Sequence, residues 1–197
     1  MKKLVLASRN ENKVEELTLF LSGLNLEVLT LRHFPAVPQV AEDGATFQEN
    51  ALKKARAIYQ VTKISTLADD SGLEVFFLNG RPGVRSARYA GDEAKDEENN
   101  EKLLGEMLGV PPRRRRAQFR AVLALVGHGF EDLTEGICLG KLAEGPRGTN
   151  GFGYDPIFIP DGLSRTYAEL STDEKNKISH RARAFRALKE ILSSRFI

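Results

Sequence analysis

The sequence predicts a fold of both strands and helices, because short apolar runs typical of buried strands alternate with segments whose apolar residues recur at helical spacing. We expect strands over 3–7 and 27–31, followed by helices over 10–22 and 46–62 respectively. The length of 197 residues fits one large domain or two closely joined lobes. The sequence contains no internal repeat, and its composition does not change enough at any point to indicate a linker between domains. Residues 1–197 are therefore predicted to form a single domain.

The helices of the first half carry boundary signals. Gly23 ends the first helix, and the second opens with a capping box in which Thr46 is followed three residues later by Glu49. After the second helix, two apolar runs flank Asp69-Asp70-Ser71-Gly72. These four residues include good turn formers, so the simplest interpretation is a turn between two strands.

The second half is predicted to hold a charged helix, a β-hairpin, a short strand and a closing helix. The charged helix spans 92–108, and its many acids are typical of a solvated surface. The hairpin joins strands over 118–126 and 133–142. A strand follows at 157–159, and Ser179 is the natural N-cap of the closing helix.

The composition narrows the classes of partner and compartment. The formal net charge is +2, and the dense basic run from Arg113 to Arg116 lacks the interleaved aromatic residues that bind single-stranded nucleic acid. We expect a solvated loop there and no nucleic-acid partner. No apolar run is long enough to span a bilayer, so we expect no membrane partner. The one cysteine, Cys138, fits a core thiol in a reducing compartment, and we predict a cytoplasmic protein.

The stretch Ser8-Arg9-Asn10-Glu11-Asn12-Lys13 is suited to an anion. It connects a strand to the start of a helix, where backbone N–H groups and the helix dipole favour negative charge. Lys13 lies one turn inside the helix and can reach the same place. A plain N-cap at Ser8 or Asn10, with Lys13 in solvent, is an equally good interpretation.

A group of carboxylates is suited to a hard cation. Asp69 and Asp70 end an apolar run, where two acids are costly unless they meet a metal or a cation. Side chains alternate along a strand, so the two should point to opposite faces, and only one is expected to be a first ligand. Glu42 is a further candidate, although an exposed loop acid is the usual alternative. Carboxylates with retained waters are what Mg²⁺ prefers.

The stretch 145–156 is the most glycine-rich part of the chain and is suited to a planar ring. Glycine lets the backbone approach a flat ligand closely, and Phe152 or Tyr154 could stack on it. His180 and Arg181 lie at a helix start, where cations oppose the dipole unless an anionic or carbonyl-bearing ligand is present. Phosphates, Mg²⁺ and a base together make a nucleoside triphosphate.

Six motifs in order resemble the inosine triphosphate pyrophosphatase family, whose members remove dITP, ITP and XTP. Each motif alone is weak, but together they cover nearly the whole chain. They are Ser8-x-Asn10-x-x-Lys13, Thr46-Phe47-x-Glu49-Asn50 with Lys54, Ala68-Asp69-Asp70-Ser71-Gly72-Leu73, Pro82-Gly83 to Ser86-Ala87-Arg88-Tyr89, Gly151-Phe152-Gly153-Tyr154-Asp155-Pro156 and Ile178-Ser179-His180-Arg181.

The resemblance implies an α/β fold with a long twisted mixed β-sheet flanked by helices, two lobes with the active-site cleft between them, and a homodimer. It implies Mg²⁺-dependent hydrolysis of the α–β phosphoanhydride to a nucleoside monophosphate and pyrophosphate. By matching position, Asp70 would bind the metal and accept the proton of the attacking water, and Glu42 would be a further metal ligand. The residues implied to hold the triphosphate are those from Ser8 to Lys13, Lys54, Ser71 and Lys175. Those implied to recognise the base are Phe152, Gly153, Tyr154, Asp155, His180 and Arg181.

Base selection has a physical basis, because a 6-oxo group accepts hydrogen bonds where the 6-amino group of adenine donates them. Donors from Arg181, His180 or backbone N–H groups would favour hypoxanthine and xanthine. Two residues depart from the family pattern, since Arg9 stands where many members have a small residue and Asn150 where many have glycine. One alternative is a pyrophosphatase for dTTP or UTP of the septum-inhibition family. Another is a catalytically silent nucleotide- or RNA-binding module that uses the arginine run.

Overall fold

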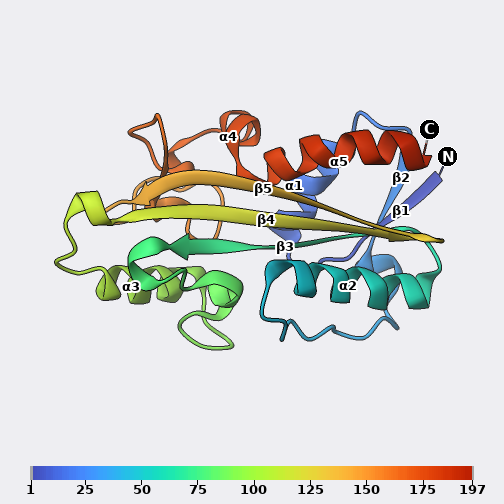
Figure 1. Ribbon diagram of the computed structural model, residues 1–197, viewed down its shortest axis with the longest axis horizontal. Helices are drawn as coiled ribbons and strands as arrows, with labels where there is room; N and C mark the ends of the chain where they lie inside the picture. Colours follow the sequence, from blue (N-terminus) through green and yellow to red (C-terminus); the bar gives the residue numbers. More distant parts are fainter. Residues whose placement is uncertain (1, 197) are drawn as a thin grey trace. The chain divides into compact units, whose positions relative to one another are not determined.

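The computed structural model describes residues 2–196, which form one sheet with helices packed on it (Figure 1). The strands are β1 (Lys2–Leu6), β2 (Leu26–Thr30), β3 (Thr66–Val75), β4 (Arg116–Gly127), β5 (Phe130–Leu142) and β6 (Phe158–Pro160). The α-helices are α1 (Glu11–Leu21), α2 (Phe47–Thr62), α3 (Asp96–Glu106), α4 (Thr172–Ile178) and α5 (His180–Phe196). Within residues 2–196 no helix is both long and apolar enough to cross a membrane.

The sheet is mixed, which confirms the predicted fold class. Its strand order is β2-β1-β3-β4-β5-β6. Strand β1 pairs in parallel with both β2 and β3, whereas β5 and β6 are antiparallel. The register pairs Leu6 of β1 with Leu67 of β3. Asp69 therefore lies two residues beyond the end of β1, on the side where the chain turns into α1.

The chain divides into two compact units, each assembled from several segments. Unit 1 consists of the described residues up to Asp70, those of Ala121–Gly136 and those from Ala182 onward. Unit 2 consists of Ser71–Arg120 and Ile137–Arg181. Strands β3, β4 and β5 and helix α5 contribute residues to both units, so no single linker separates the units along the chain.

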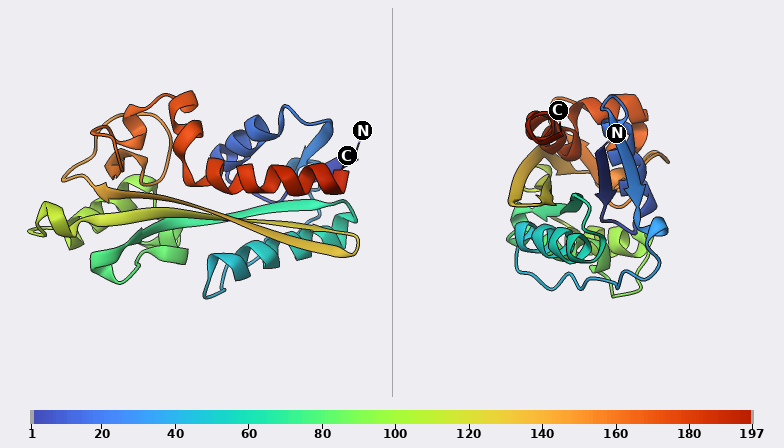
Figure 2. Two further views of the ribbon diagram at one scale, coloured as in Figure 1. Left: turned by 45° about the horizontal axis from the view of Figure 1, so that its top comes forward. Right: turned by 90° about the vertical axis from the view of Figure 1, so that its right-hand side faces the viewer.

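Unit 1 is built around the parallel strands. Leu4 and Leu6 of β1 are fully buried in a cluster that includes Leu17 of α1 and Leu188 of α5. Val5, which alternates with them, is also fully buried. Helices α1 and α5 cover one face of the sheet, and α2 covers the opposite face (Figures 1 and 2). Polar side chains of α1 and α2 can therefore approach β3 from opposite sides.

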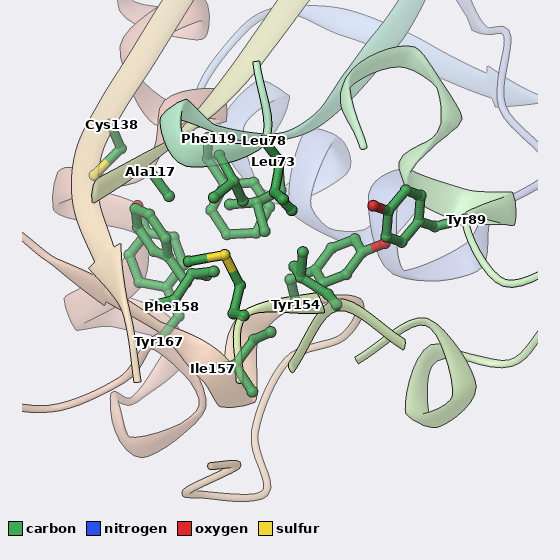
Figure 3. Close-up of a cluster of buried hydrophobic side chains, with 14 of the residues drawn as sticks. Leu73, Leu78, Tyr89, Ala117, Phe119, Cys138, Tyr154, Ile157, Phe158 and Tyr167 are labelled. Carbon is green, nitrogen blue, oxygen red and sulfur yellow. The ribbon is translucent and has the colours of Figure 1, made fainter. Parts of the chain in front are cut away.

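Unit 2 has an aromatic core that anchors the glycine-rich segment (Figure 3). The Phe119 ring packs edge-on against Phe158, with ring centroids 4.8 Å apart, and stacks on Tyr167 at 5.7 Å. Tyr154 and Ile157 belong to the same core. The segment that follows the glycines is therefore fixed in place, as expected from the strand predicted directly after it.

The predicted turn at Asp69-Asp70-Ser71-Gly72 is wrong, because β3 runs through these residues without a break. Gly72 is needed for a different reason, because another segment of the chain passes close to its Cα. A Cβ on Gly72 would lie 2.4 Å from Ser86 Oγ and 2.5 Å from the carbonyl oxygen of Gly83. A tertiary contact therefore outweighs the local turn propensity of the sequence.

Other differences concern the ends of elements. Helix α3 is shorter than the predicted range of 92–108, and β5 begins at Phe130 after a two-residue turn. The segment before Ser179 forms a helix of its own, α4, which the sequence analysis did not predict. Ser171 caps it, and its Oγ accepts a hydrogen bond from the N–H of Glu174 at 3.2 Å. Ser179 is extended and directly precedes α5, as expected of the residue before a helix.

The arginine run is only in part the solvated loop that was expected. The guanidinium of Arg115 is buried, and this burial lowers its pKa. It donates to the carbonyl oxygens of Met107, Leu142 and Ala143 at 2.8, 3.2 and 2.7 Å. Arg115 thus connects the end of α3 to the end of β5 within unit 2.

Candidate active site

The stretch from Ser8 to Lys13 forms the turn from β1 into α1. Asn10 is the N-cap of α1, because its Oδ1 accepts a hydrogen bond from the N–H of Lys13 at 3.1 Å. Ser8 Oγ in turn accepts the N–H of Asn10 at 3.2 Å. The N-cap interpretation is therefore confirmed for Asn10, whereas the expectation that accompanied it, a solvated Lys13, is wrong.

Lys13 turns back onto β3. Its Nζ lies 2.7 Å from Oδ1 of Asp69, whose side chain is fully buried. A buried carboxylate needs such a partner, since removing one member would leave an uncompensated charge. The Lys13–Asp69 pair thus fixes the start of α1 against β3.

Lys54 of α2 is the centre of a second set of buried charges. Its Nζ donates to Glu42 Oε1 at 2.6 Å, to the carbonyl oxygen of Asp69 at 2.7 Å and to Asp70 Oδ1 at 3.4 Å. Burial acts to lower the pKa of Lys54, but the carboxylates of Asp70 and Glu42 raise it more, so the pKa lies above its ordinary value. The ammonium group therefore stays charged. We call Lys13, Lys54, Glu42, Asp69 and Asp70 the charged cluster.

Asp69 and Asp70 point to opposite sides of β3, which confirms the expected alternation. Asp69 pairs with Lys13 of α1 and Asp70 pairs with Lys54 of α2, and these helices lie on opposite faces of the sheet. Burial raises the pKa of Asp70, although the ammonium groups of Lys54 and Lys13 act to lower it. Oδ2 of Asp70 is buried and has no hydrogen-bond partner among the described residues. Asp70 thus combines an increased proton affinity with an oxygen that can take a ligand.

The charged cluster fits a hard cation that is bound mainly through substrate. Within residues 2–196, no group of three His, Cys, Asp or Glu side chains is placed to hold a metal by itself. Mg²⁺ commonly takes one or two carboxylates and completes its shell with waters and substrate phosphates. The carboxylates of Asp70 and Glu42, the latter with its side chain 32% exposed, are a donor set of that kind.

The loop that carries Glu42 is held by Asn50, a residue of the second sequence motif for which no contact with this loop was predicted. Asn50 is fully buried, and its Oδ1 accepts the N–H of Gly44 at 2.8 Å. Glu49 Oε2 accepts the N–H of Ala45 at 2.7 Å. The sequence signal that could have pointed to Asn50 is its position one helical turn before Lys54, on the same face of α2.

In unit 2 the glycine-rich loop is linked internally by a carboxylate. Oδ2 of Asp155 accepts the N–H of Phe152 at 3.0 Å and a hydrogen bond from Lys175 Nζ at 2.6 Å. Gly151 has a φ of 75°, and a Cβ on it would lie 2.0 Å from the same carboxylate oxygen. Position 151 therefore requires glycine for both conformation and space.

Two cationic groups lie over the ring of Phe152. Lys175 Nζ is 4.9 Å and Arg181 Cζ is 5.1 Å from its centroid, both within cation–π range. Arg181 Nη2 also donates to Ser71 Oγ at 2.7 Å. Phe152 itself is partly exposed. We call Ser71, Phe152, Asp155, Lys175 and Arg181 the aromatic cluster.

His180 and Tyr154 support this cluster from the core. The His180 ring stacks on Phe119 at 4.6 Å with an interplanar angle of 8°, and His180 is only 2% exposed. The buried Tyr154 hydroxyl donates to the carbonyl oxygen of Ser86 at 2.9 Å. The role in base recognition that the resemblance implies for these two residues stays a prediction.

The two departures from the family pattern have local contacts. Arg9 Nη2 donates to the carbonyl oxygen of Val37 at 2.9 Å. Asn150 Nδ2 donates to the carbonyl oxygen of Leu170 at 2.9 Å, which ties the glycine-rich loop to the segment before α4. Of the remaining predicted residues, Glu11 forms an exposed ion pair with Arg32, and Asn12 is exposed.

A cavity of about 470 Å³ lies elsewhere in unit 1, between α2 and the tip of the β4–β5 hairpin. Its lining includes Arg56, Tyr59 and Phe130, and none of its lining residues belongs to the charged cluster. Arg56 donates two hydrogen bonds to Glu131 at the rim, at 2.8 and 2.5 Å.

Comparisons with known proteins agree with one another. The sequence profile of the Ham1 family matches residues 4–191. A dITP/XTP pyrophosphatase of Geobacter sulfurreducens is 49% identical over 193 residues, which cover 98% of this chain and 97% of that protein. A dITP/XTP pyrophosphatase of Bacillus licheniformis is 48% identical over 193 residues, 98% of each protein. The solved structure of a HAM1 protein from Coxiella burnetii aligns with a TM-score of 0.90 at 42% identity, covering 98% of this chain and all of that chain.

Proposed function

Because the chain belongs to the Ham1 family, we propose that it hydrolyses the non-standard purine nucleoside triphosphates dITP, ITP and XTP. The products are the nucleoside monophosphate and pyrophosphate, and the reaction requires Mg²⁺. Relatives named dITP/XTP pyrophosphatase match nearly the full length of the chain. These names support the choice of substrate, and the two clusters support the chemistry.

The observation that carries the proposal is a buried carboxylate, Asp70, 3.4 Å from the buried ammonium group of Lys54, while the ammonium group of Lys13 also acts to lower the pKa of Asp70. An enzyme that acts on a triphosphate must neutralise the negative charge of the phosphates, and the attack of water on the anhydride needs a proton acceptor. Lys13 and Lys54 supply the positive charge, and Asp70 Oδ2 supplies the acceptor. Asp70 of the charged cluster and Ser71 of the aromatic cluster are consecutive residues of β3.

In this mechanism Lys54 orients Asp70 through Oδ1, and Asp70 Oδ2 takes the proton of the attacking water. The raised pKa of Asp70 makes it a stronger base than an exposed aspartate. Lys13 and Lys54 stabilise the negative charge of the leaving pyrophosphate. Asp70 and Glu42 would hold Mg²⁺, which when bound neutralises phosphate charge and lowers the pKa of water.

The aromatic cluster accounts for base selection. The partly exposed ring of Phe152 offers a surface for stacking, and Arg181 offers N–H donors beside it. These donors match a 6-oxo group, whereas the amino group of adenine would leave them unpaired. Each buried donor left without an acceptor costs about 1–3 kcal/mol, so two such contacts would discriminate strongly.

The alternatives have less support. A dTTP or UTP pyrophosphatase lacks a reason for the Phe152 platform with Arg181 beside it, and the relatives reported above carry names of purine enzymes. A silent binding module gives no reason for a buried carboxylate oxygen, Asp70 Oδ2, that has no hydrogen-bond partner among the described residues. We also propose that the protein is a homodimer, which the family resemblance supports. We further propose that it is cytoplasmic, which the buried thiol of Cys138 supports. Sedimentation equilibrium tests the dimer.

Product analysis with dITP tests the reaction and its metal requirement. With excess Mg²⁺ we expect dIMP and pyrophosphate in equal amounts, separated by ion-exchange chromatography. Removal of Mg²⁺ by EDTA should reduce the rate by at least about 10²-fold, because the phosphate charges lose their main counter-charge. Release of dIDP and inorganic phosphate would contradict cleavage of the α–β bond. An unchanged rate after chelation would contradict the metal requirement.

A further inference from the structure

We propose that Asp96 and Asn100 of α3 are positioning residues for the loop that recognises the base, an inference that rests on the proposed function. Neither residue belongs to the charged or the aromatic cluster. By sequence both belong to a predicted helix whose many acids are typical of a solvated surface. We call these two residues the Gly153 clamp.

The clamp holds both backbone polar groups of Gly153. Asp96 Oδ2 accepts the N–H of Gly153 at 2.6 Å. Asn100 Nδ2 donates to the carbonyl oxygen of Gly153 at 2.8 Å, and also to the carbonyl oxygen of Asp96 at 2.8 Å. Asn100 is 7% exposed, so its amide is shielded from water. Two side chains one helical turn apart thus fix a residue more than 50 positions later in the chain.

Gly153 needs such support because of its conformation. It has a φ of 63°, in the left-handed region, and a Cβ on it would meet nothing within 4 Å. The glycine is therefore required by the backbone angle and not by lack of space. A glycine in open surroundings can adopt many conformations, so hydrogen bonds to its N–H and C=O restrict the loop more than they would restrict another residue.

The clamp acts on the segment that carries the Phe152 platform. Phe152 directly precedes Gly153, and its own N–H is held by Asp155. Tyr154 directly follows and is anchored in the unit 2 core, beside Tyr89 (Figure 3). Loss of the clamp would leave Gly153 as the least restrained point between these two anchors. The Phe152 ring would then sample a wider range of positions relative to the other members of the aromatic cluster.

A role in the helix alone does not explain Asp96. Acids in the first turn stabilise a helix through its dipole, but Glu97 and Glu98 are also present in that turn. Glu98 Oε2 already accepts the N–H of Lys95 at 2.6 Å at the helix start. Among these three acids, Asp96 is the one that is hydrogen-bonded to Gly153. Glu97→Gln is therefore a matched control, which removes a first-turn charge and keeps the clamp.

The test compares kcat and KM for dITP and dATP in four variants. We expect Asp96→Ala and Asn100→Ala each to reduce the dITP:dATP ratio of kcat/KM by about tenfold, because a displaced platform weakens base recognition. The loss should come mainly from a higher KM for dITP, since the charged cluster is untouched. Asp96→Asn keeps an acceptor for the Gly153 N–H and should retain the ratio. Glu97→Gln should leave both substrates unchanged.

Amide hydrogen exchange over residues 151–155 provides a readout independent of turnover. Exchange should be faster in both alanine variants and unchanged in Glu97→Gln. Asp96 is exposed, so its alanine variant should fold even if Asn100→Ala does not. If the wild-type chain had no preference for dITP, the proposed function would fail and this inference with it. A selective wild type whose ratio persists in Asp96→Ala and in a folded Asn100→Ala would overturn the inference alone.

Discussion

Asp70→Asn should reduce kcat for dITP by at least about 10³-fold while the protein remains folded. The substitution removes the proton acceptor, and general-base catalysis alone contributes about 10²–10⁴-fold. It also removes a proposed metal ligand. Burial raises the pKa of Asp70, which means that the fold prefers a neutral group at this position at neutral pH. The Tm of the variant should therefore be no lower than that of the wild type, as measured by circular dichroism.

Asp69→Asn is the matched control for this experiment. It changes the neighbouring carboxylate, which pairs with Lys13 on the other face of β3. We expect a smaller loss of turnover than in Asp70→Asn, together with a lower Tm, because the Lys13 ammonium loses its buried partner. If Asp69→Asn lost more activity than Asp70→Asn at equal folded fraction, the roles of the two acids would have to be exchanged.

Lys54→Met should reduce kcat/KM for dITP by about 10²–10³-fold, the typical cost of removing one electrostatic group from a transition state. Methionine keeps the length of the side chain and removes the charge that binds Glu42 and Asp70. The neighbouring Lys53→Met is a suitable control, because Lys53 pairs with Asp43 near the surface. Lys53→Met should retain nearly wild-type kinetics.

The pH profile of Lys54→Met gives a second, independent readout. The Lys54 ammonium acts to lower the pKa of Asp70, so its removal should raise that pKa further. A general base works only when it is ionised, so activity is lost as the pH falls through the pKa of Asp70. The acid limb of kcat/KM should therefore move to higher pH in Lys54→Met. An acid limb at the wild-type position would show that Asp70 is not the titrating base.

The fold was largely predictable because the helices carry local signals. The N-cap at Asn10 forms as the sequence predicts. Thr46 caps α2 as predicted, but Glu49 accepts the N–H of Ala45 and not that of Thr46, so only half of the predicted capping box forms. The failure at Asp69-Asp70-Ser71-Gly72 has a physical reason. Gly72 lies where Ser86 and the Gly83 backbone leave no room for a Cβ, a contact between segments that turn propensity does not contain. The helix α4 was missed although Ser171 and Glu174 supply a capping-box pattern.

The candidate site was predictable in its composition but not in its pairing. Alternation along β3 correctly separated Asp69 from Asp70. The pairing of Lys175 with Asp155 could not be predicted, because the two residues are 20 positions apart on different elements. The Gly153 clamp was missed for the same reason. Asp96 looks like any acid of a charged helix until the loop that it holds is placed beside it.

The proposed enzyme prefers 6-oxo purine triphosphates, and a comparison of four nucleotides tests this preference most directly. Initial rates of pyrophosphate release are measured for dITP, XTP, dTTP and ATP at one concentration with excess Mg²⁺. We expect dITP and XTP to be hydrolysed at least about 10²-fold faster than ATP and dTTP. The adenine of ATP would leave donors of the aromatic cluster unpaired, and the smaller base of dTTP would cover the Phe152 platform poorly. Rapid turnover of dTTP with slow turnover of dITP would contradict the account.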